Sequence, residues 1–275
     1  MYDVGLFRFA GWWLFVLFFR VPSLLVGQET DCLCEDWRER HPEWIWCDDF
    51  EDRTPLTERY FEYHDDEGDF VSLDGVGVDG SRGLRIVFQK GEVSAGSLKK
   101  SFGRTKNAYI GKHAERSNED FPEIYWKMSV RRQSGWKGGG GAKLSRASVM
   151  AGESWAQGMI AHLWSGGPGD AYLLIDPASG ISSDGTLKST RYNDFSNLRW
   201  LGNKKGKLPL FNDESAGRWF CIEVHVKLNS PGKADGVFEY WIDNELQVRS
   251  DQLNWHGDWN SDPNKRMINA VFFEN

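Results

Sequence analysis

Cationic side chains gather in one part of this sequence, and they are its clearest candidates for chemistry. Residues 99–146 hold twelve Lys or Arg and four Asp or Glu, a net charge of +8, whereas the whole chain of 275 residues carries −7. A cluster of cations in an acidic protein can form a local positive groove for an anionic ligand. The alternative is that these cations lie on the solvated faces of strands. The acidic balance of the whole chain excludes general nucleic-acid binding, which needs a basic surface.

The sequence also bears on three other kinds of site. The glycine run Gly138–Gly141 precedes Lys143, but the residues on either side of Lys143 break the Gly-Lys-Ser/Thr sequence of a phosphate-binding loop. The Gly-x-Ser-x-Gly pattern of a nucleophile elbow does not occur in the sequence. Glu223 and Glu239 are a candidate pair for a retaining glycosidase, which needs two carboxylates about 5 Å apart. The sequence leaves their separation open.

Metal binding has one candidate segment. The run Asp-Asp-Phe-Glu-Asp at residues 48–52 offers hard oxygen ligands of the kind that Ca²⁺ prefers. The alternative is a first strand with solvated acidic side chains. The sequence has no Cys-x-x-Cys motif and no close pair of His residues that would indicate zinc. We therefore expect no cofactor and no bound metal, with Ca²⁺ as the alternative.

Tryptophan is abundant, with fourteen residues. Most are expected in the core. Four lie beside turns rich in Gly or Asn and are therefore better placed to stack on a sugar ring: Trp136, Trp155, Trp200 and Trp255.

The elements that position these residues are predicted to be short strands. Apolar residues occupy every second position over 84–88, 124–130 and 220–226. One apolar face indicates antiparallel strands that are half exposed. Residues 236–242 and the strand from Glu245 flank Asp243-Asn244, and this predicts a hairpin because Asx residues tolerate positive φ. Many short strands with Gly-rich turns predict an all-β fold, a β-sandwich or jelly roll of two antiparallel sheets.

Two segments resemble secreted polysaccharide lyases of the alginate-lyase-like and glucuronan-lyase-like families. Residues 126–136, followed by Gly-Gly-Ala-Lys143-Leu, are similar to a strand and Gly-Lys-Leu turn of these enzymes. The segment 217–243 resembles their late hairpin, with Gly-Arg-Trp, then His-Val-Lys-Leu-Asn-Ser-Pro-Gly, then Asp-Gly-Val and Trp-Ile-Asp. The resemblance covers residues 47–275 and implies a concanavalin A-like jelly roll.

The resemblance implies β-elimination on an acidic (uronate) polysaccharide. Such a reaction needs a cation to neutralise the substrate carboxylate, a base to remove the C5 proton and an acid to protonate the leaving oxygen. In these lyases a Lys of the turn, an Arg on the next inner strand and Tyr residues on the following strand line the concave face. Lys143 matches the Lys, and Tyr172 matches one Tyr.

The Arg of the family does not carry over. These lyases have Arg-x-x-Trp on the strand that ends here at Trp164, and Ala161 stands in place of the Arg. His162 is one residue away and therefore on the opposite face of an ideal strand. Arg146 could supply the cation, and we expect both it and Lys143 to lie near a solvated glycine turn.

The expected site is therefore a single cleft on neighbouring strands. Its catalytic set is Lys143, Arg146, His162 and Tyr172, and its substrate-binding set is Arg131, Trp136, Trp155 and Trp200. The alternative is a non-catalytic, lectin-like module that binds carbohydrate.

The first 27 residues predict export. An unbroken apolar run of 11 residues, Phe9–Phe19, lies between Arg8 and Arg20. Its length is typical of a signal peptide and too short for a bilayer span. We predict a signal peptide over 1–27 and a secreted, periplasmic or extracellular protein, with an uncleaved anchor or a buried helix as alternatives.

After the signal peptide we predict an extended lead-in over residues 28–46 and one jelly-roll domain over 47–275. The strand predicted over Met267–Phe273 ends two residues before the last residue, so we expect a C-terminal tail to be missing. The expected partner is an acidic polysaccharide, with no nucleic acid and no stable membrane partner, and the expected state is a monomer.

Four cysteines follow residue 27, and an even number in an exported chain suggests disulfides. Cys32 and Cys34 are too close to pair with each other. Their expected partners are Cys47 and Cys221, and both connectivities stay open.

Overall fold

A computed structural model describes residues 34–92, 94–135, 143–167, 169–259, 262 and 264–274. The predicted signal peptide, Cys32 and Trp136 lie outside these residues. Two α-helical turns, α1 (Trp37–Arg40) and α2 (Leu56–Arg59), precede or flank the first strands. The strands are β1 (Glu62–His64), β2 (Phe70–Leu73), β3 (Gly83–Ile86), β4 (Ser97–Ser101), β5 (Glu123–Arg131), β6 (Lys143–Met150), β7 (Gln157–Ser165), β8 (Tyr172–Ser179), β9 (Arg199–Trp200), β10 (Lys204–Pro209), β11 (Trp219–Lys227), β12 (Gly236–Ile242), β13 (Glu245–Leu253) and β14 (Ala270–Glu274). Short 3₁₀ turns occur at Asp66–Gly68, Val78–Gly80, Phe195–Asn197 and Asp213–Ser215.

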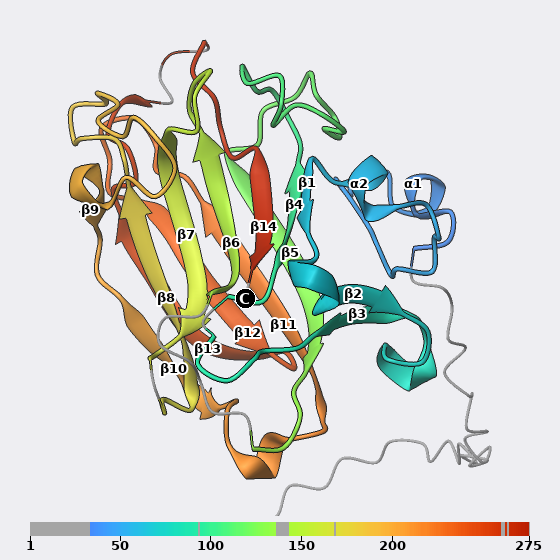
Figure 1. Ribbon diagram of the computed structural model, residues 1–275. Helices are drawn as coiled ribbons and strands as arrows, with labels where there is room; N and C mark the ends of the chain where they lie inside the picture. The colour runs from blue at the N-terminus through green and yellow to red at the C-terminus, as the bar shows by residue number, and fades with distance from the viewer. Residues whose placement is uncertain are drawn as a thin grey trace, which may run out of the picture.

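Two antiparallel sheets form the body of the molecule, one in front of the other (Figure 1). The larger sheet has eight strands in the order β1-β4-β14-β6-β7-β8-β10, with β9 paired to β8. The smaller sheet has the order β13-β12-β11-β5. This arrangement confirms the predicted all-β jelly-roll sandwich. A third, two-stranded sheet of β2 and β3 was not predicted, and the apolar alternation from residue 84 belongs to it.

The core lies between the two main sheets because each contributes every second side chain to it. The larger sheet buries Ala147, Leu163 and Ile175, and the smaller sheet buries Ile222 and Val224 against them. A fully buried aliphatic side chain contributes about 1.5–3 kcal/mol. The residues between these positions point away from the core. On the larger sheet they form what we call the outer face.

Strand positions on the smaller sheet match the sequence prediction. The alternating segments 124–130 and 220–226 lie in β5 and β11, and these two strands pair over their full lengths. The predicted hairpin is β12–β13, and its turn residues Asp243 and Asn244 have φ values of 49° and 66°. Two consecutive positive φ angles give the turn the twist that a tight hairpin needs.

The N-terminal segment differs from the predicted extended lead-in. Its described part contains the helical turn α1. A disulfide joins Cys34 to Cys47, whose Cα atoms are 5.5 Å apart. This bridge belongs to one of the two connectivities left open by the sequence. Among the described residues Cys221 is a free cysteine. It lies in β11 of the smaller sheet, opposite Ser129 of β5.

The acidic run at residues 48–52 forms no strand. Asp48 instead makes an ion pair with Arg59 at 2.6 Å and accepts a hydrogen bond of 2.6 Å from the hydroxyl of Tyr60. The partners of Asp48 are thus protein groups. Among the described residues, no group of three or more His, Cys, Asp or Glu side chains is arranged to hold a metal ion.

Candidate functional site

Three adjacent strands of the larger sheet, β6, β7 and β8, carry the candidate site. In their register Arg146 lies opposite His162, and His162 lies opposite Asp176. Residues directly opposite each other on paired strands project to the same side of a sheet. The three side chains therefore form a row across the outer face of the larger sheet.

A β-bulge brings Lys143 to this face. Strict alternation from Arg146 would turn Lys143 toward the core, but the register shifts between Lys143 and Ser145. Lys143 consequently lies opposite Trp164, which is two residues beyond His162, and Leu144 packs against the core instead. Bulges commonly re-aim a side chain in this way.

Tyr172 completes the group. On β8 it alternates with the buried core residues Leu173 and Ile175, so it shares the outer face with Asp176. All four residues of the predicted catalytic set thus lie on neighbouring strands and on one face. Ala161 is buried in the core, so the position equivalent to the family's Arg points away from this face.

Arg146 is enclosed, and the expectation that it lies near a solvated turn is wrong. Its side chain is fully buried and makes an ion pair with Glu274 at 2.8 Å. It also donates hydrogen bonds to Asn193, at 3.1 Å, and to the hydroxyl of Tyr192. The rings of Tyr192 and Phe272 cover the guanidinium, with centroids 4.8 and 5.0 Å from its central carbon. The guanidinium of Arg146 is therefore enclosed by protein groups.

Lys143 has no ion pair or hydrogen bond with the residues that the structure describes, and it is partly buried. Burial lowers the pKa of its ammonium group, and the nearby charges of Arg146 and Lys99 lower it further, against the opposing effect of Glu274. A desolvated cation without a direct ion pair is a strong site for an anion.

His162 is wholly buried under aromatic rings. Its imidazole stacks on Trp164, with ring centroids 4.5 Å apart and planes 9° from parallel, and Trp200 lies 5.8 Å away. Nδ1 is 3.1 Å from the backbone oxygen of Asp176, so it carries the proton and donates. Burial holds the pKa of His162 well below its usual value, and Arg146 and Lys143 add to the effect. The ring is neutral and supports Trp164 rather than facing solvent.

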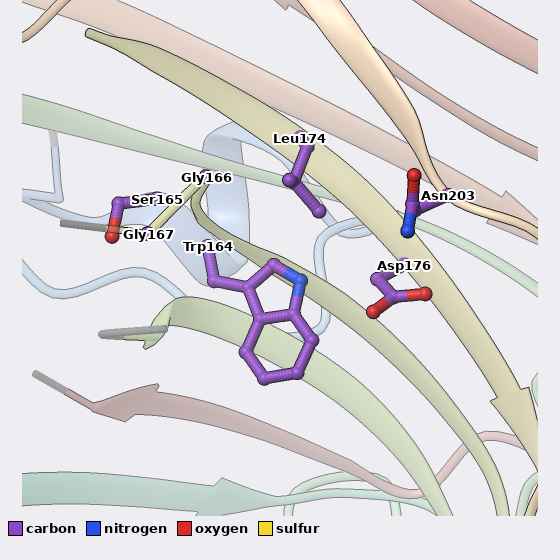
Figure 2. Close-up of a pocket in the computed structure, with 7 residues that line it drawn as sticks. All are labelled: Trp164, Ser165, Gly166, Gly167, Leu174, Asp176 and Asn203. Carbon is purple, nitrogen blue, oxygen red and sulfur yellow. The ribbon is translucent and has the colours of Figure 1, made fainter. Parts of the chain in front are cut away.

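A pocket opens beside Trp164, with an empty volume of about 380 Å³ that includes open solvent. Figure 2 shows Trp164 on one side of it and Asp176 and Asn203 on the other. The remaining lining residues are Ser165, Gly166, Gly167 and Leu174. Burial raises the pKa of Asp176 from 3.8 to about 6. Asp176 was not among the predicted site residues, although its place opposite His162 follows from the β7–β8 pairing.

Replacing Asp176 by Asn is expected to stabilise the protein at neutral pH. Because burial raises the folded-state pKa above the unfolded value, the ionised carboxylate destabilises the fold above about pH 6, and this penalty vanishes below about pH 4. After allowance for its partial exposure, we expect a gain of about 1–2 kcal/mol at pH 7.5. Urea unfolding at pH 7.5 and at about pH 4.5 measures the gain, which should shrink at the lower pH. Destabilisation by Asp176→Asn at both pH values would contradict the prediction. Asp79→Asn, at an exposed position, is the control.

The predicted substrate-binding residues are scattered. Trp200 is 42% exposed and stacks with Trp164 on the outer face of the larger sheet. Trp155 packs in an aromatic cluster beside Tyr192. Arg131 lies on β5, opposite Trp219 and over its ring at 4.7 Å, so the smaller sheet separates it from Lys143. Of the Trp residues considered for stacking, Trp255 is fully buried in the core.

Some cations of the basic segment are paired within the fold. Five of its cations make ion pairs: Lys99 with Glu62, Lys100 with Glu115, Arg104 with Asp120, Arg116 with Glu119 and Arg146 with Glu274. Three of these partners belong to the segment itself, so only Glu62 and Glu274 reduce its excess of positive charge. Lys143 lies beside Arg146 on the outer face and makes no ion pair with the described residues.

The proposed glycosidase pair lies elsewhere. Glu239 is buried on the smaller sheet, where it contacts Nδ1 of His225 at 2.8 Å and Arg249 at 2.9 Å. Its carboxylate is thus occupied by two neighbouring side chains.

Among the described residues, no helix is long and apolar enough to cross a membrane.

Comparison with solved structures returns polysaccharide lyases. The chain is similar to the PL-14 alginate lyase of Aplysia kurodai, with a TM-score of 0.49 and 16% identity, over 76% of this chain and 78% of that one. It is similar to alginate lyase vAL-1 from Chlorella virus, with a TM-score of 0.48 and 12% identity, over 78% of this chain and 89% of that one. It is also similar to the endo-β-1,4-glucuronan lyase of Trichoderma reesei, with a TM-score of 0.46 and 11% identity, over 74% of this chain and 73% of that one. These are the two classes that the sequence resembles. No family model and no curated protein matches the chain.

Proposed function

We propose that the outer face of the larger sheet binds an acidic (uronate) polysaccharide and cleaves it by β-elimination. The observation that carries this proposal is the placement of Lys143, whose ammonium group makes no direct ion pair with the described residues and lies on the same face as Tyr172. The stacked rings of Trp164 and Trp200 add an aromatic surface of the kind that sugar rings bind. The sequence resemblance to polysaccharide lyases supports the same reaction.

The chemistry needs two groups from this face. The Lys143 ammonium neutralises the uronate carboxylate, and this makes the C5 proton more acidic. Tyr172, in its phenolate form at the start of the step, takes that proton. The electron pair of the C5–H bond forms the C4–C5 double bond as the C4–O bond breaks. The leaving oxygen then receives the proton from Tyr172, so protons and charge balance.

Arg146 and His162 are assigned positioning roles. Arg146 fixes Tyr192 and Glu274 behind Lys143, and His162 supports the ring of Trp164 from below. Neither side chain is exposed to a ligand in this structure.

We also propose that the protein is a secreted monomer whose first 27 residues are a signal peptide. The Cys34–Cys47 disulfide supports export, since disulfides persist in oxidising compartments.

A second candidate function is non-catalytic binding of carbohydrate. The burial of Ala161 in the core favours this function, because the family's Arg is then missing from the outer face. Arg146 and His162 are also buried, so Lys143 and Tyr172 are the members of the predicted catalytic set that stay partly exposed. A binder would retain the role of Lys143 and the aromatic surface without turnover.

Affinity measurements test the acidic-glycan assignment common to both candidates. We expect polyuronate to bind more tightly than a neutral glucan, and to bind more weakly at 1 M salt, where the Debye length falls to about 3 Å. Lys143→Ala should abolish most of this preference. Lys127→Ala, which removes an exposed Lys from the smaller sheet, should not change it. Equal affinity for both glycans, unchanged by salt, would contradict the proposal.

A further inference from the structure

The pocket beside Trp164 contains an acidic group where a uronate-binding site would be expected to contain a cation. The Asp176 carboxylate is half-buried and has no ion pair or hydrogen bond with any residue that the structure describes. None of the lining residues is a Lys or Arg. A second carboxylate placed here would meet like charge in a partly desolvated site, and such contacts are costly.

The polar groups of the pocket suit hydroxyls. An ionised carboxylate accepts hydrogen bonds through both oxygens, and two neighbouring sugar hydroxyls can donate one to each. Asn203 is exposed at the rim and offers an amide that both donates and accepts. Figure 2 shows both side chains at one side of the pocket, across from the indole of Trp164.

The apolar wall is rigid. Trp164 is held from behind by the stacked ring of His162, and the His162 ring is itself tied to the backbone of Asp176. The indole and the backbone of Asp176 therefore keep a fixed relation to each other, and the carboxylate extends from that backbone. A fixed aromatic ring beside a hydrogen-bonding carboxylate matches the two surfaces of a sugar, its C–H face and its hydroxyl edge.

Lys143 lies on the far side of Trp164. The two are register partners on β6 and β7, and such partners have Cα atoms about 4.5–5.5 Å apart. A glycan chain that places a carboxylate at Lys143 can therefore place a neighbouring residue in the pocket.

We propose that this pocket is a subsite for a neutral sugar residue with two adjacent free hydroxyls, so that the substrate is a mixed glycan in which neutral residues neighbour uronates. This inference rests on the proposed function, because the uronate is assigned to Lys143. It adds that a polymer of uronate alone is not the preferred ligand.

The test compares three oligosaccharides of equal length by calorimetry: one alternating glucuronate and glucose, one of glucuronate alone and one of glucose alone. The wild-type protein should bind the alternating oligosaccharide most tightly at pH 7.5. Asp176→Asn and Asn203→Ala should each weaken its binding, by about 10- to 100-fold for Asp176→Asn. Asp176→Asn should leave the affinity for oligoglucuronate unchanged or increased, since it removes a repulsive charge.

Two results separate this inference from the proposed function. If Asp176→Asn weakens oligoglucuronate as strongly as the alternating oligosaccharide, or if the wild type prefers oligoglucuronate, the neutral subsite is overturned while the acidic-glycan assignment survives. If Lys143→Ala has no effect on either acidic oligosaccharide, the proposed function fails. Asp176→Asn is expected to fold, because it removes a buried charge.

Discussion

Replacing Arg146 by Ala is expected to destabilise the fold by about 3–5 kcal/mol, because it leaves a buried carboxylate without its partner. Glu274 is buried, which raises its pKa, but Arg146, the Tyr192 hydroxyl and Lys143 outweigh burial and hold that pKa below its usual value. The ionised form of Glu274 is thus the one that the fold stabilises. Removing the guanidinium removes the main source of that stabilisation. Urea or thermal unfolding of the variant measures the loss.

Two further variants identify the cause. Arg131→Ala makes the same chemical change at an exposed position on β5 and should cost at most about 1 kcal/mol. Arg146→Met combined with Glu274→Gln should be more stable than Arg146→Met alone, because the double change removes the buried charge as well as its partner. Equal losses for Arg146→Ala and Arg131→Ala would show that the Arg146 network contributes little.

Replacing Lys143 by Ala is expected to reduce the rate of elimination by about 10²–10³-fold, the usual cost of removing one group that stabilises developing charge. The same change should weaken ligand binding, since the ammonium attracts the carboxylate before and during the reaction. Stability should change little, because the described residues make no direct ion pair with Lys143, and removing its desolvated ammonium group offsets the loss of its attraction to Glu274.

The matched control is Lys127→Ala, an equal change of charge on the opposite side of the sandwich. It should retain the wild-type rate. Lys143→Arg should restore part of the binding, because the charge is kept, and less of the rate, because the guanidinium has a different shape. A Lys143→Ala variant with an unchanged rate would remove Lys143 from the mechanism.

Local pattern was sufficient to predict much of the fold. Strands β5, β11, β12 and β13 follow from period-2 alternation and from the Asp243-Asn244 turn, which are properties of neighbouring residues. The two-stranded β2–β3 sheet was missed, because an alternating segment does not reveal which sheet it joins.

The site was predicted less completely, since its chemistry depends on contacts between distant residues. Arg146 and Glu274 are 128 residues apart in the chain, and nothing around Arg146 in the sequence signals its burial. The bulge that turns Lys143 outward is a register shift, which alternation alone does not show. Asp176 could have been found, because the alternation of β7 and β8 determines which residue faces His162 once the hairpin register is known.

The proposed activity of this face is elimination across a uronate linkage. The most direct measurement is the ultraviolet absorbance of the wild-type protein incubated with a panel of acidic glycans, both polyuronates and mixed polymers, with neutral glucan as control. β-Elimination creates a C4–C5 double bond conjugated to the carboxyl group, so the account predicts that absorbance rises with time on at least one acidic glycan and is lost in Lys143→Ala. Binding of an acidic glycan without any increase in absorbance across the panel would contradict the claim of turnover and leave a carbohydrate-binding module.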